Sequence, residues 1–452
     1  MTSNAGSPEL LPPIVVWRRS LPDPVRTLQI CLLVVVLGYG ARQDNNSPFI
    51  IPILENVIGS TFTGIEIVLL LIALLELVRR LAWRDPYLNR TPVRWPLWGV
   101  TILLAVTPYL RMLFYENGFR FPLELTGFPV FVATLFLYSQ IFRRNEVAIM
   151  AWLIFLAGLY KSIEGVVIYQ TVGLGWGLLT GWRDAALLTM MVVGAMIAWI
   201  VRPESDRVYR TLRRALFLAI PIALFTFTNS TRRSYILGAI VSLVIILFYL
   251  HAREKRRLLK VVPVVVATVL AAAFMTGTNQ FLERMSVLSN PSSEGSSAYR
   301  LVEVFNITQE ISERPLFGWP FGQIWRNFTV IEFENVSNVM PHNTYLYVAW
   351  RSGLVGLSVW LWFLVVLLRA HHRTVRQARR PLERFLALWG MSCTVSVIIA
   401  GFTMSAVADR LQTFFPFVIA MSILLPGALS LPGRSNASAG SGMIATGASE
   451  TP

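Results

Sequence analysis

Stretches of about 20 mostly apolar residues recur along the chain, and no other feature restricts its fold as strongly. Each stretch is long enough to cross, as a helix, a hydrocarbon core roughly 30 Å thick. Only 14% of the 452 residues are charged and 54% are hydrophobic, whereas a soluble domain of this length would need about twice as many charges to cover its surface. The sequence therefore predicts an all-α integral membrane protein, a polytopic bundle of about 12 transmembrane helices with one long periplasmic loop containing short helices.

The loops between the predicted spans indicate how the chain is oriented. Basic residues gather in short loops near residues 79–94, 202–214, 253–260 and 369–384, and such loops stay in the cytoplasm by the positive-inside bias. With the N-terminus inside, every one of these loops is cytoplasmic and residues 278–341 lie outside. The net charge of +15 therefore reports topology rather than nucleic-acid binding. The predicted spans lie near residues 26–41, 62–81, 96–114, 122–142, 147–169, 184–201, 215–230, 234–250, 261–277, 342–368, 385–406 and 411–430.

The predicted domain organisation follows from these spans. It comprises a cytoplasmic N-terminal tail (1–25), transmembrane helices 1–9 (26–277), the long periplasmic loop (278–341), transmembrane helices 10–12 (342–430) and a disordered, low-complexity C-terminal tail (431–452). Within the long loop, the run AYRLVEVFNITQEISERP has helical i, i+4 spacing at Leu301 and Phe305, and Pro315 ends it. A turn dense in glycine, proline and aromatic residues, LFGWPFG, follows this helix.

Three arginines on the outer side are candidates for function, because ionisable groups inside or beside a membrane are costly and tend to mark functional sites. Arg232 and Arg233 lie at the outer junction of two spans, against the topological bias, and Arg300 opens the helix of the long loop. The long loop is acidic overall, so an anion there needs a local arginine cluster. A guanidinium group matches phosphate oxygens and stays charged.

One histidine shares this outer face. The chain has only four histidines; His371 and His372 are predicted to lie in a basic loop, and His251 opens another. The fourth, His342, stands between the long loop and the next span, and histidine is the side chain best suited to accept a proton near neutral pH. Arginines and a histidine at one outer face suggest chemistry on a phosphate-containing lipid.

Simpler interpretations of these residues stay open. An outer arginine can extend to lipid phosphates with no catalytic role, and Arg300 can be an ordinary exposed charge on a helix. His342 can cap the following helix together with Asn343. Asn343 and Arg410 are further candidates for a supporting role at the site.

Two other groups of residues are assigned to structure. Lys161 and Glu164 lie three residues apart within a span and are interpreted as a mutually satisfied pair. The aromatic residues Trp319, Phe321 and Trp325 are interpreted as loop core or interface anchors rather than as platforms for stacking sugars.

Three motifs in a fixed order resemble a known family. The chain shows TRRSYIL at a span junction, then SSAYRLVEVFNITQEISERPLFGWPFG, then PHNTYLYVAWRSGLVGL leading into a span. This order resembles the O-antigen ligase and polymerase superfamily of WaaL/Wzy-like membrane glycosyltransferases, over roughly residues 215–370. In that family an arginine-initiated helix runs into a "hPlfGwG" turn, and a segment that begins with HN follows. Pro320 is a departure, because the family usually keeps a glycine-rich link there.

The resemblance implies an activity and a role for each candidate residue. It implies transfer of a glycan from an undecaprenyl-diphosphate carrier to an acceptor such as lipid A–core, on the periplasmic face of the bacterial inner (cytoplasmic) membrane. Arg232 or Arg233, together with Arg300, would bind the diphosphate, and His342 would be the general base of an inverting displacement. It implies no cofactor or metal. The expected partners are the lipid-linked donor, a glycan or lipid-linked acceptor and the bilayer, with no nucleic acid.

Three alternatives remain. A polymerase of O-antigen or exopolysaccharide repeat units uses the same donor with a different acceptor. A metal-dependent lipid-linked glycosyltransferase would place acidic residues in the first outer loop, where Asp44 and Glu55 lie. No metal-ligand set is predicted elsewhere, and Cys31 and Cys393 both fall in apolar runs. The third alternative is a polysaccharide transporter or flippase without catalysis.

Overall fold

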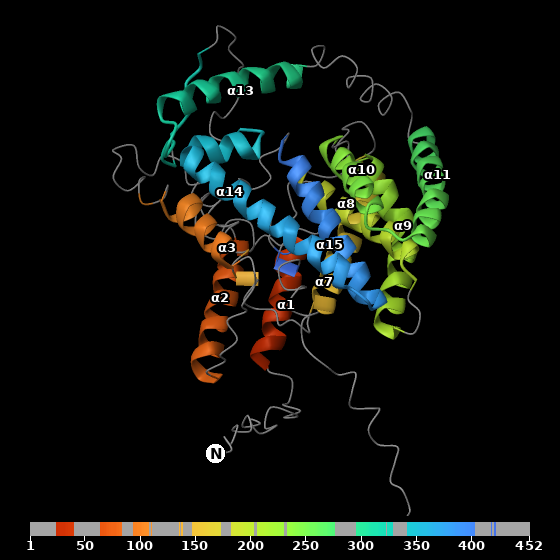
Figure 1. The fold of residues 1–452 in the computed structure, drawn as a ribbon. Coiled ribbons are helices and arrows are strands. Elements are labelled where there is room, and N and C mark those ends of the chain that lie inside the picture. The colour runs from red at the N-terminus through yellow and green to blue at the C-terminus, as the bar shows by residue number, and fades with distance from the viewer. Residues whose placement is uncertain are drawn as a thin grey trace, which may run out of the picture.

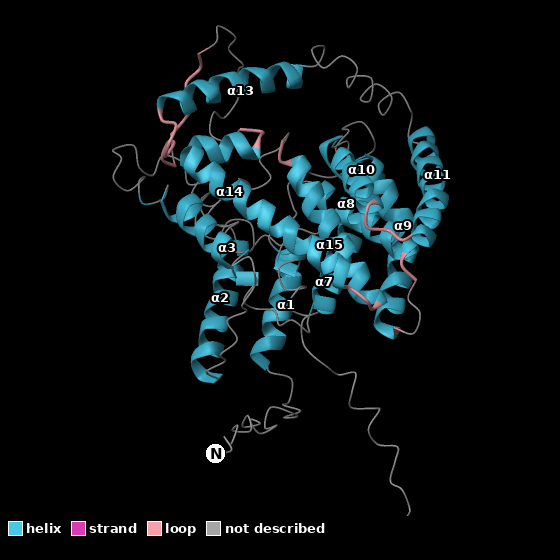
Figure 2. Ribbon diagram, in the orientation of Figure 1, coloured by secondary structure: helices cyan, strands magenta, loops and turns pink. Residues whose placement is uncertain are grey.

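The computed structural model describes residues 24–39, 64–83, 94–107, 147–172, 182–202, 206–229, 233–275, 295–321, 323–328 and 341–402, together with Leu110, Leu135, Leu137, Tyr138, Phe417, Ala420 and Met421. Within this part of the chain every regular element is a helix (Figure 1, Figure 2). The all-α class predicted from the sequence is therefore confirmed for the described residues.

The helices carry the labels of Figure 1. They are α1 (Pro24–Tyr39), α2 (Gly64–Trp83), α3 (Arg94–Val100) with its continuation η2 (Thr101–Val106), α7 (Val147–Val172), α8 (Trp182–Ile200), α9 (Arg207–Asn229), α10 (Arg233–Leu247), α11 (Ala252–Met275), α13 (Gly295–Glu313), α14 (Thr344–Gln377) and α15 (Pro381–Ala400).

Each predicted span overlaps one of these helices, except those near 122–142 and 411–430, which lie almost entirely outside the described residues. Three stretches of the described helices are long and apolar enough to cross a membrane: Ala148–Gln170, Thr344–Gln377 and Pro381–Ala400. Shorter apolar stretches occupy Trp95–Leu104, Leu187–Ile200 and Ser234–Leu247. These helices support a membrane protein, and the count of about twelve spans stays a prediction.

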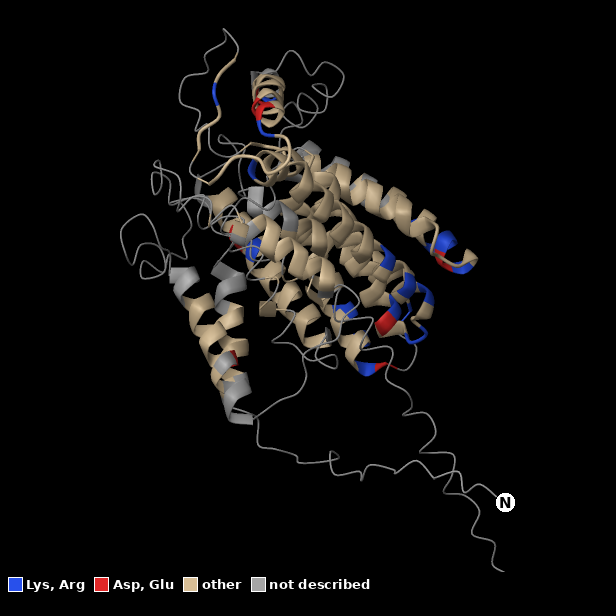
Figure 3. Cartoon of the chain, turned by 60° about the vertical axis from the view of Figure 1, so that its left-hand side comes forward, with Lys and Arg blue, Asp and Glu red and all other residues tan. Residues whose placement is uncertain are grey.

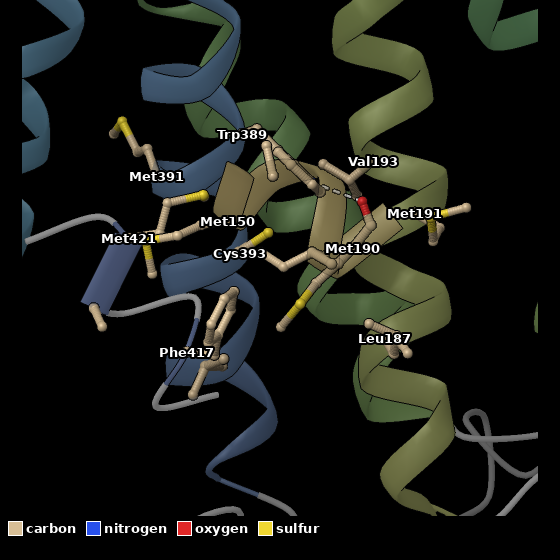
Figure 4. Packing of buried hydrophobic residues seen from close by; sticks show 14 of the residues in the cluster. Met150, Leu187, Met190, Met191, Val193, Trp389, Met391, Cys393, Phe417 and Met421 are labelled. Atoms are coloured by element: carbon tan, nitrogen blue, oxygen red, sulfur yellow. Dashed lines mark hydrogen bonds between the residues drawn. The ribbon is translucent and has the colours of Figure 1, made fainter. Parts of the chain in front are cut away.

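The core of the bundle lies where α15 packs against α8 and α10. Its side chains are largely apolar, and methionines from several elements meet there (Figure 4). Trp389 of α15 is fully buried and donates its indole N–H to the Met190 carbonyl oxygen of α8 at 2.8 Å. This bond satisfies a polar group that would be costly to bury without a partner.

Lys and Arg of the described residues gather at one end of the bundle, around the starts of α9, α11 and α15 (Figure 3). Arg384 at the start of α15 donates to both carboxylate oxygens of Glu254 at the start of α11, at 2.8 and 2.6 Å. Arg213 of α9 donates to the Ala198 carbonyl oxygen of α8 at 2.7 Å. In contrast, α13 lies across the opposite end of the bundle (Figure 1).

Helix α14 spans 34 residues and is bent at Gly353, whose φ of 68° and ψ of −172° are not helical. It continues beyond the predicted end of its span, so the prediction that His371 and His372 lie in a loop is wrong. His371 is fully buried with Nε2 3.0 Å from the Thr394 hydroxyl oxygen. The helix extends because its last turns are basic, which suits a helix C-terminus, and no proline interrupts it before Pro381.

Two buried polar pairs lie in the bundle, one within a helix and one between two helices. Lys161 Nζ lies 2.5 Å from Glu164 Oε2, and both side chains are buried, which confirms their interpretation as a mutually satisfied pair. Gln29 of α1 donates to the Glu76 carboxylate of α2 at 3.2 Å, also in a buried setting. A polar contact between two helices, as from Gln29 to Glu76, helps helices to associate inside a membrane.

Candidate active site

The first residues of α14 are tied to the end of α15, and this junction positions His342. Asn343 is the N-cap of α14: its side-chain oxygen accepts from the backbone N–H groups of Tyr345 and Leu346 at 2.9 and 3.1 Å. Its amide nitrogen donates to the Phe402 carbonyl oxygen at 3.1 Å. A cap satisfies donors that the start of a helix leaves open. Asn343 thus caps α14, and the His342 imidazole makes other contacts.

His342 meets a buried carboxylate on α13. Its backbone N–H donates to Glu303 Oε1 at 2.8 Å, and its Nδ1 lies 3.4 and 3.3 Å from the two Glu303 carboxylate oxygens. The Glu303 side chain is 2% exposed, whereas the His342 side chain is 50% exposed. The Tyr299 ring packs against the imidazole at 5.8 Å between centroids and an interplanar angle of 89°. One side of the imidazole therefore faces the protein, and the other is exposed at the protein surface.

Helix α13 packs against α14 (Figure 1), and its buried side carries polar residues. Glu303, Asn306 and Glu310 are buried, whereas Leu301 and Phe305 are 70% and 47% exposed. The apolar spacing that predicts the helix thus lies on its outer side. The polar side of α13 can be the buried one because its polar side chains have hydrogen-bond partners in the loop and at the start of α14.

Arg300 lies on α13 one turn before Glu303. Residues three and four apart on a helix are neighbours, with roughly 5–6 Å between their Cβ atoms, so Arg300 and Tyr299 both adjoin Glu303. Arg300 is partly buried, and its guanidinium group makes no hydrogen bond or ion pair with the described residues.

The turn that follows α13 is held against the bend of α14. The backbone N–H of Trp319 donates to the Trp350 carbonyl oxygen at 2.6 Å. The backbone N–H of Leu354 donates to the Pro315 carbonyl oxygen at 2.7 Å. These backbone groups flank Gly353, where the helical hydrogen-bond pattern is interrupted. The turn thus satisfies groups that the bend would otherwise leave open in the interior.

Two glycines make this contact possible. Gly318 has a φ of 63° and Gly353 a φ of 68°, in the left-handed region that glycine adopts readily. A Cβ on Gly318 would lie 2.6 Å from the Gly353 nitrogen, and a Cβ on Gly353 would collide with the Leu316 carbonyl group. The LFGWP turn and the RSGLVG segment, which are separate in the sequence, therefore form one structural unit.

Arg351 fixes the loop beyond this turn. Its side chain is 1% exposed and donates to the carbonyl oxygens of Pro320 and Gln323 at 2.7 and 2.8 Å. Its guanidinium carbon lies 3.4 Å from the ring centroid of Trp350, against which Trp325 also packs. The loop carbonyl groups and the ring surround this arginine, so it anchors the loop. Pro320, which departs from the family pattern, supplies one of the acceptors.

The aromatic residues of the loop belong to its core. Phe321 and Trp325 are each 3% exposed, and Trp319 donates its indole N–H to the Glu310 carbonyl oxygen at 2.9 Å. Arg326 donates its Nε to the buried Glu310 carboxylate at 2.7 Å. The interpretation of these aromatic residues as loop core is confirmed.

Several predicted site residues lie beyond what the structure describes. Arg232 and Arg410 are outside the described residues, and for Arg233 only the backbone is described, as the first residue of α10. Their roles stay predictions. Asp44 and Glu55 also lie outside the described residues. Within the described part of the chain, no group of three or more His, Cys, Asp or Glu side chains is placed to hold a metal ion.

The sequence prediction did not single out Glu303 or Arg351. Glu303 stood among several glutamates of an acidic loop, and Arg351 lay inside an apolar run. A signal for Glu303 was present, since Glu303, Asn306 and Glu310 recur at helical spacing and form a polar stripe on α13. No comparable signal marks Arg351, because its partners are backbone carbonyl groups of a distant loop.

The fold and the site define a class of protein. It is a helical membrane protein in which a half-exposed histidine lies against a buried carboxylate at one end of the bundle. One turn before this carboxylate, the same helix carries an arginine whose guanidinium group has no partner among the described residues.

Residues 216–361 match the family model described as O-antigen ligase. This range contains α10, α11, α13 and the bend of α14, and with them Arg300, Glu303 and His342. No curated protein matches the chain. The resemblance to the O-antigen ligase and polymerase family, which three motifs predicted, is confirmed, and it supports a ligase- or polymerase-type function on lipid-linked glycans at a membrane.

Proposed function

We propose that this protein is an O-antigen ligase-like glycosyltransferase, which moves a glycan from an undecaprenyl-diphosphate carrier to an acceptor sugar such as that of lipid A–core. The observation that carries the proposal is the setting of His342. This histidine lies within the family match, its imidazole is half exposed, and a buried carboxylate adjoins it. A proton acceptor open on one side and held on the other is the arrangement that general-base catalysis requires.

The proposed face of the membrane follows from the two ends of the bundle. The ends of α8, α10 and α14 that carry basic loops lie together, and such loops remain in the cytoplasm. His342 and α13 lie at the opposite end (Figure 1), which is therefore assigned to the periplasm of the inner membrane. Lipid-borne donor and water-borne acceptor would meet at this surface.

The reaction divides between the arginines and the histidine. The acceptor hydroxyl oxygen attacks the anomeric carbon of the donor sugar and its proton passes to His342. The bond from the anomeric carbon to the diphosphate oxygen breaks, and its electron pair leaves with the lipid diphosphate. Arg300, with Arg232 or Arg233, would neutralise the charge that grows on the diphosphate. Attack from the face opposite the leaving group inverts the anomeric centre.

The test is turnover by the purified protein in lipid nanodiscs, with an undecaprenyl-diphosphate-linked glycan and a defined acceptor. We expect acceptor-dependent transfer with release of lipid diphosphate, at a rate that EDTA does not change. In proteoliposomes, movement of the donor across the bilayer without transfer would contradict the proposal and identify a transporter. Loss of transfer with EDTA would instead indicate the metal-dependent class.

The acceptor separates the ligase from the polymerase, which would use the same donor. Offering lipid A–core and a lipid-linked repeat unit in parallel assays distinguishes them. A ligase transfers to lipid A–core, whereas a polymerase lengthens the lipid-linked glycan and leaves lipid A–core unmodified.

A further inference from the structure

We infer that Glu303 is a positioning residue for His342: it holds the imidazole in the tautomer whose Nε2 can accept the proton of the acceptor hydroxyl. The inference rests on the proposed function, since it assigns a partner to the base of that reaction. Glu303 lies within the second of the three motifs, but the resemblance assigns it no role. The inference comes from the contact between α13 and the start of α14.

The geometry fixes both the backbone and the ring of His342. Glu303 Oε1 accepts the His342 backbone N–H at 2.8 Å, while the imidazole Nδ1 lies 3.3 Å from Oε2 of the same carboxylate. A single buried side chain thus sets the position of the main chain and the direction of the ring. The Tyr299 ring, perpendicular to the imidazole, limits its rotation on another side.

The carboxylate also selects the tautomer. An ionised carboxylate accepts hydrogen bonds and cannot donate them, so the Nδ1 that faces it carries the proton. The lone pair of the neutral ring then lies on Nε2, away from Glu303. The negative charge of Glu303 acts on its surroundings as well: burial, and after it this charge, raise the pKa of Tyr299 above its ordinary value, so Tyr299 remains a neutral hydroxyl beside the pair.

A second buried glutamate on the same helix shows what a purely structural carboxylate looks like. Glu310, fully buried, accepts a hydrogen bond from the Arg326 guanidinium at 2.7 Å, and this cation compensates its burial. Among the described residues, the hydrogen bonds of the Glu303 carboxylate go only to His342. Burial without a fixed cation is costly, and it is offset in this reaction when His342 becomes a cation.

The proton balance is complete without another reactant. As the acceptor oxygen bonds to the anomeric carbon, its proton moves to His342 Nε2, and Glu303 stabilises the resulting imidazolium through Nδ1–H. The proton then leaves from Nε2 to water, which restores the neutral ring. The long Nδ1 distance of 3.3 Å is expected to shorten during this step, since catalytic hydrogen bonds tighten on the way to the transition state.

The direct test is Glu303→Gln, measured by kcat and KM in the transfer assay. Glutamine keeps the size of the side chain and an acceptor for the His342 backbone N–H, but its NH2 group would face Nδ1 and favour the other tautomer. We expect kcat to fall by about 10²-fold while the KM for the lipid donor is unchanged. Glu303→Asp, which keeps the carboxylate, should recover part of the loss. Glu313→Gln is the matched control, because this glutamate lies on the same helix with its side chain 42% exposed.

A second readout does not depend on activity. The chain has only four histidines, so ¹⁵N NMR of histidine-labelled protein gives few signals. The signals of His342 are the ones that disappear in the His342→Ala variant. We expect Nδ1–H in the wild type and Nε2–H in Glu303→Gln; the same tautomer in both would overturn the inference.

The outcomes separate the inference from the function on which it rests. If His342→Ala is inactive and Glu303→Gln retains its kcat, the role of Glu303 is wrong and the proposed function stands. If Glu303→Gln lowers kcat and raises the donor KM together, Glu303 is a structural residue and the inference is again wrong. If His342→Ala keeps full transfer, the proposed function itself fails.

Discussion

At the scale of single residues, the site joins two side chains from opposite environments. The His342 imidazole is 50% exposed and the Glu303 carboxylate only 2%, so the pair crosses the boundary between solvent and protein. Nδ1 of the imidazole lies against the Glu303 carboxylate, and the rest of the ring is partly exposed. Arg300 lies one turn from Glu303 on the same helix, and its guanidinium group carries a permanent positive charge.

Gly353 is the residue whose substitution tests how the loop is held. Gly353→Ala adds a Cβ at a φ of 68°, where it collides with the Leu316 carbonyl group. The left-handed conformation alone costs about 1–2 kcal/mol for a residue with a side chain. We expect a lower Tm in detergent and faster proteolysis between residues 314 and 328, because the turn loses its contact with α14.

Gly99→Ala provides the comparison for this measurement. A Cβ at Gly99 would first meet Val359 Cγ1 at 3.2 Å, and its φ is not left-handed. We expect a Tm close to that of the wild type. If Gly353→Ala and Gly99→Ala lowered Tm equally, the bend of α14 would have no special part in holding the loop.

At the scale of elements, the start of α14 is a cap that carries a candidate catalytic residue. Asn343 was predicted as a supporting residue. In the structure it accepts from the backbone N–H groups of Tyr345 and Leu346 and donates to the Phe402 carbonyl oxygen. Because His342 precedes the cap directly, the order of the first turn determines where the imidazole lies relative to Glu303.

Substitution of Asn343 tests this role. Asn343→Ala removes the cap, at a cost of about 0.5–2 kcal/mol, and should lower kcat because His342 is no longer held. Asn343→Asp keeps an acceptor for both backbone N–H groups and places a negative charge at a helix N-terminus, which is favourable; it should retain most activity. The steady-state kcat of the two variants is the measurement that tests this role. If both variants were equally inactive, the amide group would act on substrate rather than as a cap.

Helix α13 shows where periodicity is informative and where it is not. The spacing of Leu301 and Phe305 correctly predicts a helix, yet these residues face outward and Glu303 and Glu310 face inward. Hydrophobic spacing assigns an apolar stripe but not what covers it. The inner face is decided by hydrogen bonds to Arg326 and His342, which come from distant parts of the chain.

At the scale of the whole molecule, the sequence predicted the parts that depend on local composition. Long apolar stretches marked most of the described helices, and the order of three motifs marked the family. The contact between His342 and Glu303 joins residues 39 positions apart, and the contact of the LFGWP turn with the bend at Gly353 is equally non-local. Such pairings have no period along the chain, so they required the structure.

The measurement that tests the central claim most directly is single-turnover transfer from pre-bound lipid-diphosphate donor, with donor binding determined on the same samples. We expect His342→Ala to bind donor normally and to transfer about 10²–10⁴-fold more slowly, because only the proton acceptor is lost. Arg300→Ala should weaken donor binding, with Arg300→Lys intermediate because lysine lacks the planar fork. Transfer by His342→Ala at the wild-type rate would contradict the account.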